Sequence, residues 1–166
     1  MQKQVEYSDA AKTKYPEQVV IVIAKDENGK ANPVTLGWTM IASGNPPMMA
    51  IALAKKHYSI QAINHSQCFT ISYPTSEMDK ETLFFGSKSG RDADKLAECQ
   101  CKTQPAEKID SVLLSDAVAN FECKLVSQTE AGDHIIFIGE IVCSHVNTES
   151  KKRLYAIAPG HILGSV

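Results

Sequence analysis

The chain has 166 residues, of which 43% are hydrophobic and 22% charged, and its formal net charge is −2. This length can bury a core without disulfides or metal ions, and this composition is typical of a globular protein rather than a disordered one. The near balance of charge, with no long basic run, excludes the electrostatic signature of a nucleic acid partner.

A single domain over residues 1–166 is therefore expected, with residues 1–14 as a loosely attached N-terminal segment. The polar N-terminus lacks the features of a secretory signal, and no apolar stretch approaches the ~18 residues of a membrane-spanning helix. We expect a cytoplasmic protein with no membrane partner. Its five cysteines are an odd number and are predicted to be reduced thiols.

The first half of the chain predicts several strands. Residues 18–24 form a β-branched run, the Asn28-Gly29 turn follows, and a returning strand is expected over residues 33–42. Asn45-Pro46-Pro47 bars a helix, so a further strand is expected over residues 48–54. Ser59 is then expected to cap a short helix to about residue 64, before a strand over residues 67–73.

The second half begins with two predicted short helices, where Ser76 precedes Asp79 and Ser89 precedes Asp92 in capping-box spacing. Strands are then predicted over residues 112–114, 117–128 and 134–146, followed by an apolar tail over residues 153–158 and an unassigned loop. Strands, a small helical insertion and more strands predict a mainly β fold with short helices, arranged as an antiparallel barrel or sandwich.

Several common site motifs are absent. There is no GxGxxG after a strand, no GxxxxGK, no HExxH, no GxSxG and no paired CxxC. Rossmann and P-loop chemistry therefore lose their usual support. Cys99-x-Cys101 has the wrong count and spacing for a structural zinc site, so these are interpreted as core or surface thiols, and no metal site is predicted.

The segment NPVTLGWTMIASGNPPM, residues 32–48, contains the only tryptophan, Trp38, among small polar residues. Gly37 permits close approach of a ligand to the backbone, and on an unbroken strand Thr35, Thr39 and Ser43 would share one face. These residues fit two interpretations equally: a ligand site, or a solvent-facing edge strand with a tryptophan in the core.

This segment resembles the flavin reductase-like, FMN-binding split-barrel family, which includes flavoredoxins. The resemblance continues in SGRDADKL at 89–96, FECKL at 121–125 and GEIV at 139–142, and it covers residues 15–164. It implies an antiparallel split β-barrel that binds FMN at the interface of a homodimer.

The resemblance also implies the cofactor-binding residues. A ring and ribityl wall would run along the strand, a phosphate end would lie at the start of the next helix, and the SGRD segment would complete the site; no catalytic residue is assigned. These residues are Thr35, Leu36, Gly37, Trp38, Thr39, Ala42, Ser43, Lys56, His57, Tyr58, Ser59, Ser89, Gly90 and Lys95. From the residues alone an alternative remains open, in which Ser59 and Ser89 are only helix caps and Lys95 is a solvated helix residue.

His57 departs from the family pattern, which often has Arg or Lys at this position. The phosphate contact is then expected to pass to Lys55 or Lys56, or to become pH-dependent. The end of the chain matches the family only loosely. His161 is therefore interpreted as a loop or core histidine rather than as a site residue.

The function implied is that of an NAD(P)H:flavin oxidoreductase-like protein, which passes electrons through FMN to a flavin or protein acceptor. Two alternatives remain open: a flavoredoxin-type carrier reduced by a redox protein partner, and a flavin- or haem-binding module without turnover. No separate dinucleotide motif distinguishes NADH from NADPH.

Overall fold

The computed structural model describes all 166 residues. Its centre is a seven-stranded antiparallel sheet in the order β3-β2-β6-β9-β10-β5-β4. This mainly β architecture confirms the predicted fold class. The strands are β2 (Val20–Lys25), β3 (Ala31–Leu36), β4 (Thr39–Gly44), β5 (Pro47–Ala54), β6 (Cys68–Tyr73), β9 (Ala119–Ala131) and β10 (His134–Val146).

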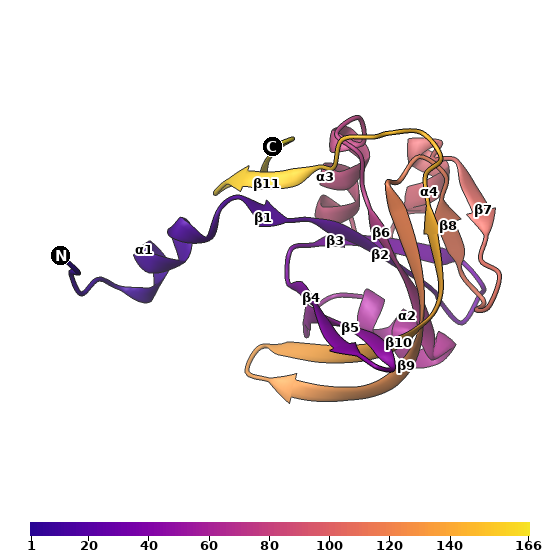
Figure 1. The fold of residues 1–166 in the computed structure, drawn as a ribbon. Helices are drawn as coiled ribbons and strands as arrows, with labels where there is room; N and C mark the ends of the chain where they lie inside the picture. The colour runs from indigo at the N-terminus through magenta and orange to yellow at the C-terminus, as the bar shows by residue number, and fades with distance from the viewer.

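Smaller elements surround this sheet. Strands β1 (Glu17–Gln18), β11 (Tyr155–Ala158) and β12 (Ile162–Gly164) form one small sheet, and β7 (Thr103–Pro105) pairs with β8 (Val112–Leu114). The helices are α1 (Tyr7–Ala11), the 3-10 turn η1 (Lys12–Lys14), α2 (Ser59–Ser66), α3 (Asp79–Ser87) and α4 (Lys95–Cys99). Helix α1 projects from the body and buries no residue (Figure 1). No helix combines the length and the apolarity needed to cross a membrane.

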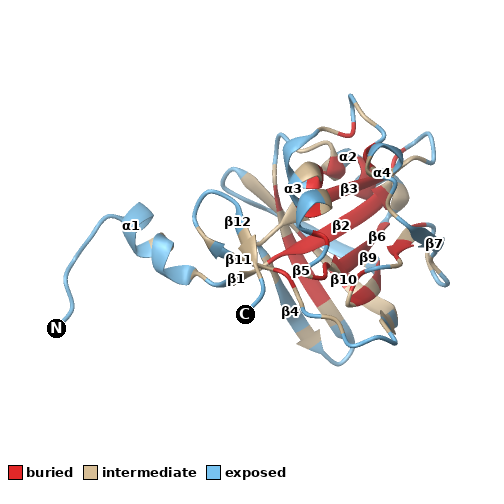
Figure 2. Ribbon diagram, turned by 90° about the horizontal axis from the view of Figure 1, so that it is seen from above, coloured by how far each residue is buried: buried red, intermediate tan, exposed pale blue.

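Strand β2 lies at the centre of the core and is buried from Val20 to Ala24 (Figure 2). Successive side chains of a strand point to opposite faces, so one continuous apolar run can fill two clusters. Val20 and Val22 pack in the interior cluster with Phe69 and Phe137. Ile21 and Ile23 pack in a second cluster with Phe85 of α3, Met78 and Leu114. Helix α3 is thereby fixed against the sheet, where it forms one wall of the site described below.

The strand predicted over residues 33–42 is broken, and that prediction is wrong. Strand β3 ends at Leu36 beside β2, and β4 begins at Thr39 beside β5, at the other end of the same sheet. Gly37 and Trp38 form the crossing between them. The prediction that Thr35, Thr39 and Ser43 share one face required an unbroken strand, so it is also wrong. Trp38 is 48% exposed and is not a core residue.

Both predicted helices after β6 are present, but none of the proposed serine caps is correct. Helix α3 begins at Asp79 without a side-chain cap, and α4 is capped by Asp94, which accepts from the N–H of Ala97. Ser89 instead accepts from the N–H of Arg91 in the preceding loop. The N-cap position of α2 is Tyr58, which leaves the Ser59 hydroxyl free for other contacts.

Candidate functional site

A cavity of about 310 Å³ lies between the first half of β3, the start of α2, the end of α3 and the loop before α4. These four segments come together because α2 and α3 both pack against β3. The residues that line the cavity are Asn32, Val34, Lys56, His57, Tyr58, Ser59, Phe85, Gly86, Ser87, Lys88, Ser89, Gly90, Arg91 and Lys95. We call it the cationic cavity.

The cationic cavity has positive side chains from Lys56, Lys88, Arg91 and Lys95, and no carboxylate lines it. The N-terminal end of α2 also faces it, through Tyr58 and Ser59. The first N–H groups of a helix have no partner within the helix, and its dipole end is positive. Both sets of groups favour the same ligand, so the cavity is suited to a phosphate or another compact anion.

Lys95 is the most buried of these cations, with 2% of its surface exposed. Its ammonium group donates to the carbonyl oxygens of Phe85 and Lys88, both at 3.2 Å. Burial lowers the pKa of Lys95 to about 8. A buried ammonium that bonds only to neutral carbonyls is stabilised by a nearby anion. An anionic ligand in the cavity would therefore stabilise the charged form of Lys95.

His57 also lines the cationic cavity. Burial and then the positive charges of Lys56, His134 and Lys95 lower the pKa of His57. Its ring is therefore neutral near pH 7. The buried Nδ1 atom has no hydrogen-bond partner in the protein. Lys56 lines the cationic cavity, whereas Lys55 forms an ion pair with Glu130 at 2.7 Å. Of the two lysines proposed to replace the missing basic residue, only Lys56 reaches the site.

Asn32 and Gly90 form the floor of the cationic cavity. The side-chain amide of Asn32 donates to the Ser59 hydroxyl at 2.9 Å, but its buried Oδ1 has no partner. Gly90 packs so closely that a Cβ atom there would lie 2.0 Å from Asn32 Oδ1. An unpaired acceptor in a cavity is costly unless a ligand supplies a donor.

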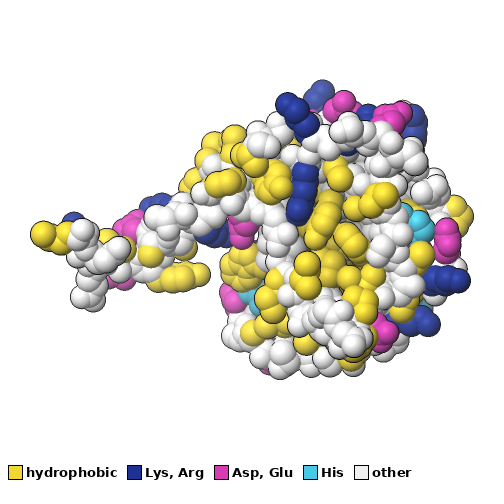
Figure 3. Space-filling model, viewed as in Figure 1, with side chains coloured by type: hydrophobic (Ala, Val, Ile, Leu, Met, Phe, Trp, Pro, Cys, Tyr) yellow, Lys and Arg dark blue, Asp and Glu magenta, His cyan; other side chains and the backbone are white.

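A second, larger cavity of about 560 Å³ adjoins the first and shares His57, Gly86 and Ser87 with it. Its walls come from residues 14–19, residues 35–38, α3 and the C-terminal strands, and many of them are hydrophobic. Figure 3 shows hydrophobic side chains gathered on this face, between the β1–β11 sheet and the β4–β5 hairpin. We call it the apolar cavity. A polar end joined to a larger apolar space suits a ligand with a charged end and a flat ring.

Trp38 stands at the edge of the apolar cavity. Its ring lies 4.5 Å from that of His134 between centroids, and the Lys14 ammonium lies 5.8 Å from its centre. Thr35, farther along the wall, donates its hydroxyl to the carbonyl of Thr82 in α3 at 2.6 Å. The Thr35 side chain therefore joins β3 to α3, and the atoms beside it that remain free for a ligand belong to the backbone.

The structure groups most of the predicted site residues. Lys56, His57, Tyr58, Ser59, Ser89, Gly90 and Lys95 line the cationic cavity, and Thr35, Leu36, Gly37 and Trp38 line the apolar cavity with His57. Thr39, Ala42 and Ser43 line neither cavity, because β4 turns away to pair with β5. The hydroxyl of Thr39 donates to the carbonyl of Ala50 at 3.0 Å.

The sequence analysis missed Asn32, Arg91 and His134. Asn32 opens the segment that carried the resemblance, and Arg91 lies within the SGRD segment, so both had a signal. His134 had none, because it begins a strand far along the chain and meets Trp38 only in the fold. His161 lines the apolar cavity from an exposed loop and has a φ of 63°.

The geometry agrees with comparisons to known proteins. The family model "Flavin reductase like domain" matches residues 12–161. A flavin reductase from Pseudomonas putida is 28% identical over 141 residues, which cover 85% of this chain and 79% of that protein. An NADH-dependent FMN reductase from Streptomyces nodosus is 26% identical over 125 residues, covering 74% and 65% of the two chains.

Among solved structures, the flavoredoxin of Desulfovibrio vulgaris (Miyazaki F) superimposes with a TM-score of 0.86 at 25% sequence identity, covering 100% of this chain and 93% of that one. The split-barrel fold that the resemblance implied is thus confirmed. With the family model matching nearly the whole chain, this protein belongs to the flavin reductase-like family.

Proposed function

We propose that this protein binds FMN, with the phosphate in the cationic cavity and the flavin ring in the apolar cavity. One observation carries the proposal: an acid-free cavity lined by Lys56, Lys88, Arg91 and Lys95 opens, past His57, into a larger apolar cavity. The phosphate requires the first and the aromatic ring the second.

Two details of the structure fit this cofactor. Asn32 Oδ1 and His57 Nδ1 are buried without partners, and FMN has hydroxyl and ring N–H groups that can donate to such atoms. The absence of a Cβ at Gly90 lets the loop before α4 pack directly against Asn32 at the floor of the cationic cavity. Lys56, Arg91 and Lys95 would hold the phosphate, and the backbone of residues 35–38 would face the ring.

We further propose that the bound flavin accepts electrons from NADH or NADPH and passes them to a flavin or protein acceptor. FMN, when bound, supplies the electron-transfer chemistry, so this chain needs no general base. Its own residues bind the cofactor, orient it and limit water around it. The names of the two reductases described above support this route, and neutral His57 is placed to contact the cofactor without adding charge near pH 7.

A homodimer is also proposed, because β4 is an edge strand of the large sheet and carries exposed apolar side chains. Met40 is 60% exposed and Ile41 75% exposed. A long apolar edge strand invites pairing with another chain, and a second copy presents the same surface. Analytical ultracentrifugation tests this proposal: Ile41→Lys is expected to shift a wild-type dimer toward monomer.

The main experiment titrates the purified protein with FMN while following the emission of Trp38, the only tryptophan of the chain. Quenching that saturates at one FMN per chain is expected, since Trp38 lines the apolar cavity. Riboflavin, which lacks the phosphate, serves as the matched ligand and is expected to bind more weakly. Equal affinity for both ligands would show that the cationic cavity does not bind the phosphate. Absence of quenching by either ligand would refute flavin binding.

The electron donor is tested by adding NADH or NADPH to the FMN-loaded protein without oxygen. Loss of the yellow flavin absorption within seconds supports the reductase route. If neither nucleotide reduces the flavin but a reduced ferredoxin does, the protein is a carrier of the flavoredoxin type instead.

A further inference from the structure

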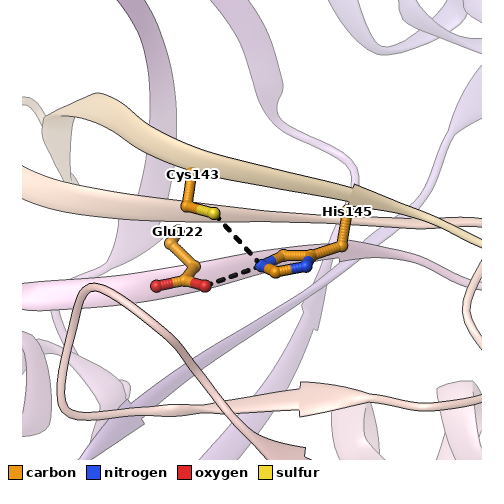
Figure 4. Close-up of side chains that lie close together, drawn as sticks. All are labelled: Glu122, Cys143 and His145. Carbon is orange, nitrogen blue, oxygen red and sulfur yellow. Dashed lines mark hydrogen bonds and ion pairs between the residues drawn. The ribbon is translucent and has the colours of Figure 1, made fainter.

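A cluster of three different metal-binding side chains lies in the β9–β10 ladder, formed by Glu122, Cys143 and His145 (Figure 4). Cys143 pairs directly with Glu122 across the two strands. Because alternate residues of a strand share a face, His145 projects on the same side as Cys143. Sheet pairing therefore assembles the cluster from residues whose spacing forms no metal motif. None of its residues lines either cavity of the proposed flavin site.

The three donor atoms converge on one point. His145 Nε2 lies 2.7 Å from Glu122 Oε1 and 3.4 Å from Cys143 Sγ, and all three donor atoms lie within 4.8 Å of one another. In a nucleophile–base–acid relay, the histidine uses one nitrogen for each partner. Here a single nitrogen, Nε2, faces both the carboxylate and the sulfur, so the cluster is not arranged as a relay. The arrangement is that of ligands around a shared centre.

The separation of the nitrogen and sulfur donors is close to the one that a metal requires. Zinc–nitrogen bonds of ~2.0–2.1 Å and zinc–sulfur bonds of ~2.3 Å separate the two donors by about 3.5 Å at a tetrahedral angle. The 3.4 Å between Nε2 and Sγ matches this separation. The contact between Nε2 and Oε1 is a hydrogen bond at present and would lengthen when a metal replaced its proton.

The surroundings favour a cation. Glu122 is fully buried, and its carboxylate accepts the N–H groups of Glu107 and Lys108 at 2.9 and 2.7 Å, which fixes its position. Burial raises the pKa of the Cys143 thiol, and the negative charges of Glu122 and Glu107 raise it further. A bound cation would reverse this by stabilising the thiolate.

We propose that Glu122, Cys143 and His145 bind one divalent transition-metal ion of the zinc class. Mixed nitrogen, sulfur and oxygen donors suit Zn²⁺, which also accepts water or a further carboxylate in a fourth position. Glu107 is one candidate for that carboxylate, since its backbone N–H bonds to Glu122 and its charge acts on Cys143. The His145 side chain is 21% exposed, so an ion can enter from solvent.

Calorimetric titration of the purified, chelator-treated protein with ZnCl₂, without added FMN, tests the proposal. One Zn²⁺ per chain is expected, with release of the Cys143 proton, seen as a heat that depends on the ionisation enthalpy of the buffer. X-ray absorption at the zinc edge, which the flavin does not disturb, is expected to show one sulfur neighbour. Neither measurement depends on flavin turnover, so its outcome is independent of the proposed function.

Two variants make the test specific. Cys143→Ser keeps the size of the side chain and is expected to weaken Zn²⁺ binding by at least about tenfold and to remove the sulfur neighbour. Cys99→Ser, which changes a partly buried thiol outside the cluster, is expected to bind as wild type does. The proposal is overturned if wild type binds no Zn²⁺, if Cys143→Ser binds equally well, or if Cys99→Ser removes the sulfur neighbour. Thermal unfolding without metal checks that both variants are folded.

Discussion

The side chain of Asn32 joins β3 to the first residue of α2 by donating its amide N–H to the Ser59 hydroxyl at 2.9 Å. In this orientation Oδ1 is buried beside Gly90 and has no hydrogen-bond partner. Because Asn32 is buried, its Oδ1 cannot accept a hydrogen bond from bulk water instead. Two segments distant in the sequence are thus held together by a residue that lines the cationic cavity and keeps one buried acceptor unpaired.

Asn32→Asp is expected to weaken FMN binding by at least about tenfold, because a carboxylate replaces the neutral amide in a cavity that would hold a phosphate. Titration of Trp38 emission measures the change. Asn64→Asp makes the same substitution on the exposed side of α2 and is the matched control. Equal loss in both variants would show that a general charge effect, and not the cavity, is responsible.

Lys95→Met is expected to weaken FMN binding by roughly ten- to a hundredfold, while riboflavin binding stays nearly unchanged. The substitution keeps the buried chain but removes the ammonium group that would meet the phosphate. Lys80→Met on the exposed face of α3 is the control. The same loss of affinity for riboflavin would mean that Lys95 supports the fold of the cavity rather than the phosphate.

The affinity for FMN should depend on pH through Lys95. The pKa of Lys95 is about 8 without ligand, and a bound phosphate would raise it. Below about pH 8 the amine is protonated in both states and contributes a constant affinity. Above that pH, binding must take up a proton, so the affinity falls as pH rises.

Titrations from about pH 7 to about pH 9.5 measure this effect, a range in which a phosphate monoester stays doubly ionised. In Lys95→Met the decline should disappear, and riboflavin should show little of it in wild type. A decline of the same size in the variant would assign the titration to another group.

Gly90→Ala tests how closely the loop before α4 approaches β3. A Cβ atom at residue 90 would lie 2.0 Å from Asn32 Oδ1 and 3.2 Å from the Tyr58 ring, so one wall must move. FMN binding is expected to fall more than tenfold, with a loss of stability of about 1–3 kcal/mol from overpacking. Gly44→Ala, where nothing lies within 4 Å, is expected to change neither. If Gly90→Ala keeps the wild-type affinity for FMN, the loop before α4 can move to accommodate the added Cβ atom.

Patterns in the sequence predicted the strands that have strong local signals. The β-branched run of β2, the Asn28-Gly29 turn and the Pro46-Pro47 pair each fix a local conformation, whatever the rest of the chain does. The break at Gly37 and Trp38 could not be predicted, since residues on both sides favour strands and only distant partners separate β3 from β4. Strands β1, β7 and β12 are two or three residues long and form no pattern of their own.

The site divides in the same way. Residues 56–59 meet Ser89, Gly90 and Lys95 in the cationic cavity as the family resemblance implied, because each lies at a helix start or in the loop before one. The serine caps were wrong because capping was inferred from residue type and spacing alone. At α2 the hydroxyl of Ser59 instead serves a tertiary contact with Asn32, and local spacing carries no information on such contacts.

A last prediction concerns Asp26, which is buried in the β2–β3 turn and holds Tyr58 at the edge of the cationic cavity. Its carboxylate accepts from the N–H groups of Asn28 and Lys30 and from the Tyr58 hydroxyl. Burial acts to raise the pKa of Asp26, but these hydrogen bonds outweigh it and leave the pKa lowered. The stabilisation from a lowered carboxylate pKa is complete above the unfolded pKa of ~3.9 and is lost as pH falls through the folded value.

Asp26→Asn should therefore reduce the free energy of unfolding by about 1–3 kcal/mol at neutral pH, because an amide cannot accept all three bonds. The difference from wild type should begin to shrink below about pH 4, where the carboxylate is protonated in the unfolded chain, and should shrink further at the lower pH that protonates the native carboxylate. Urea unfolding followed by circular dichroism at several pH values measures both effects, with exposed Asp92→Asn as control. A difference that stays constant down to low pH would show that the shape of the turn, rather than the carboxylate charge, carries the stability.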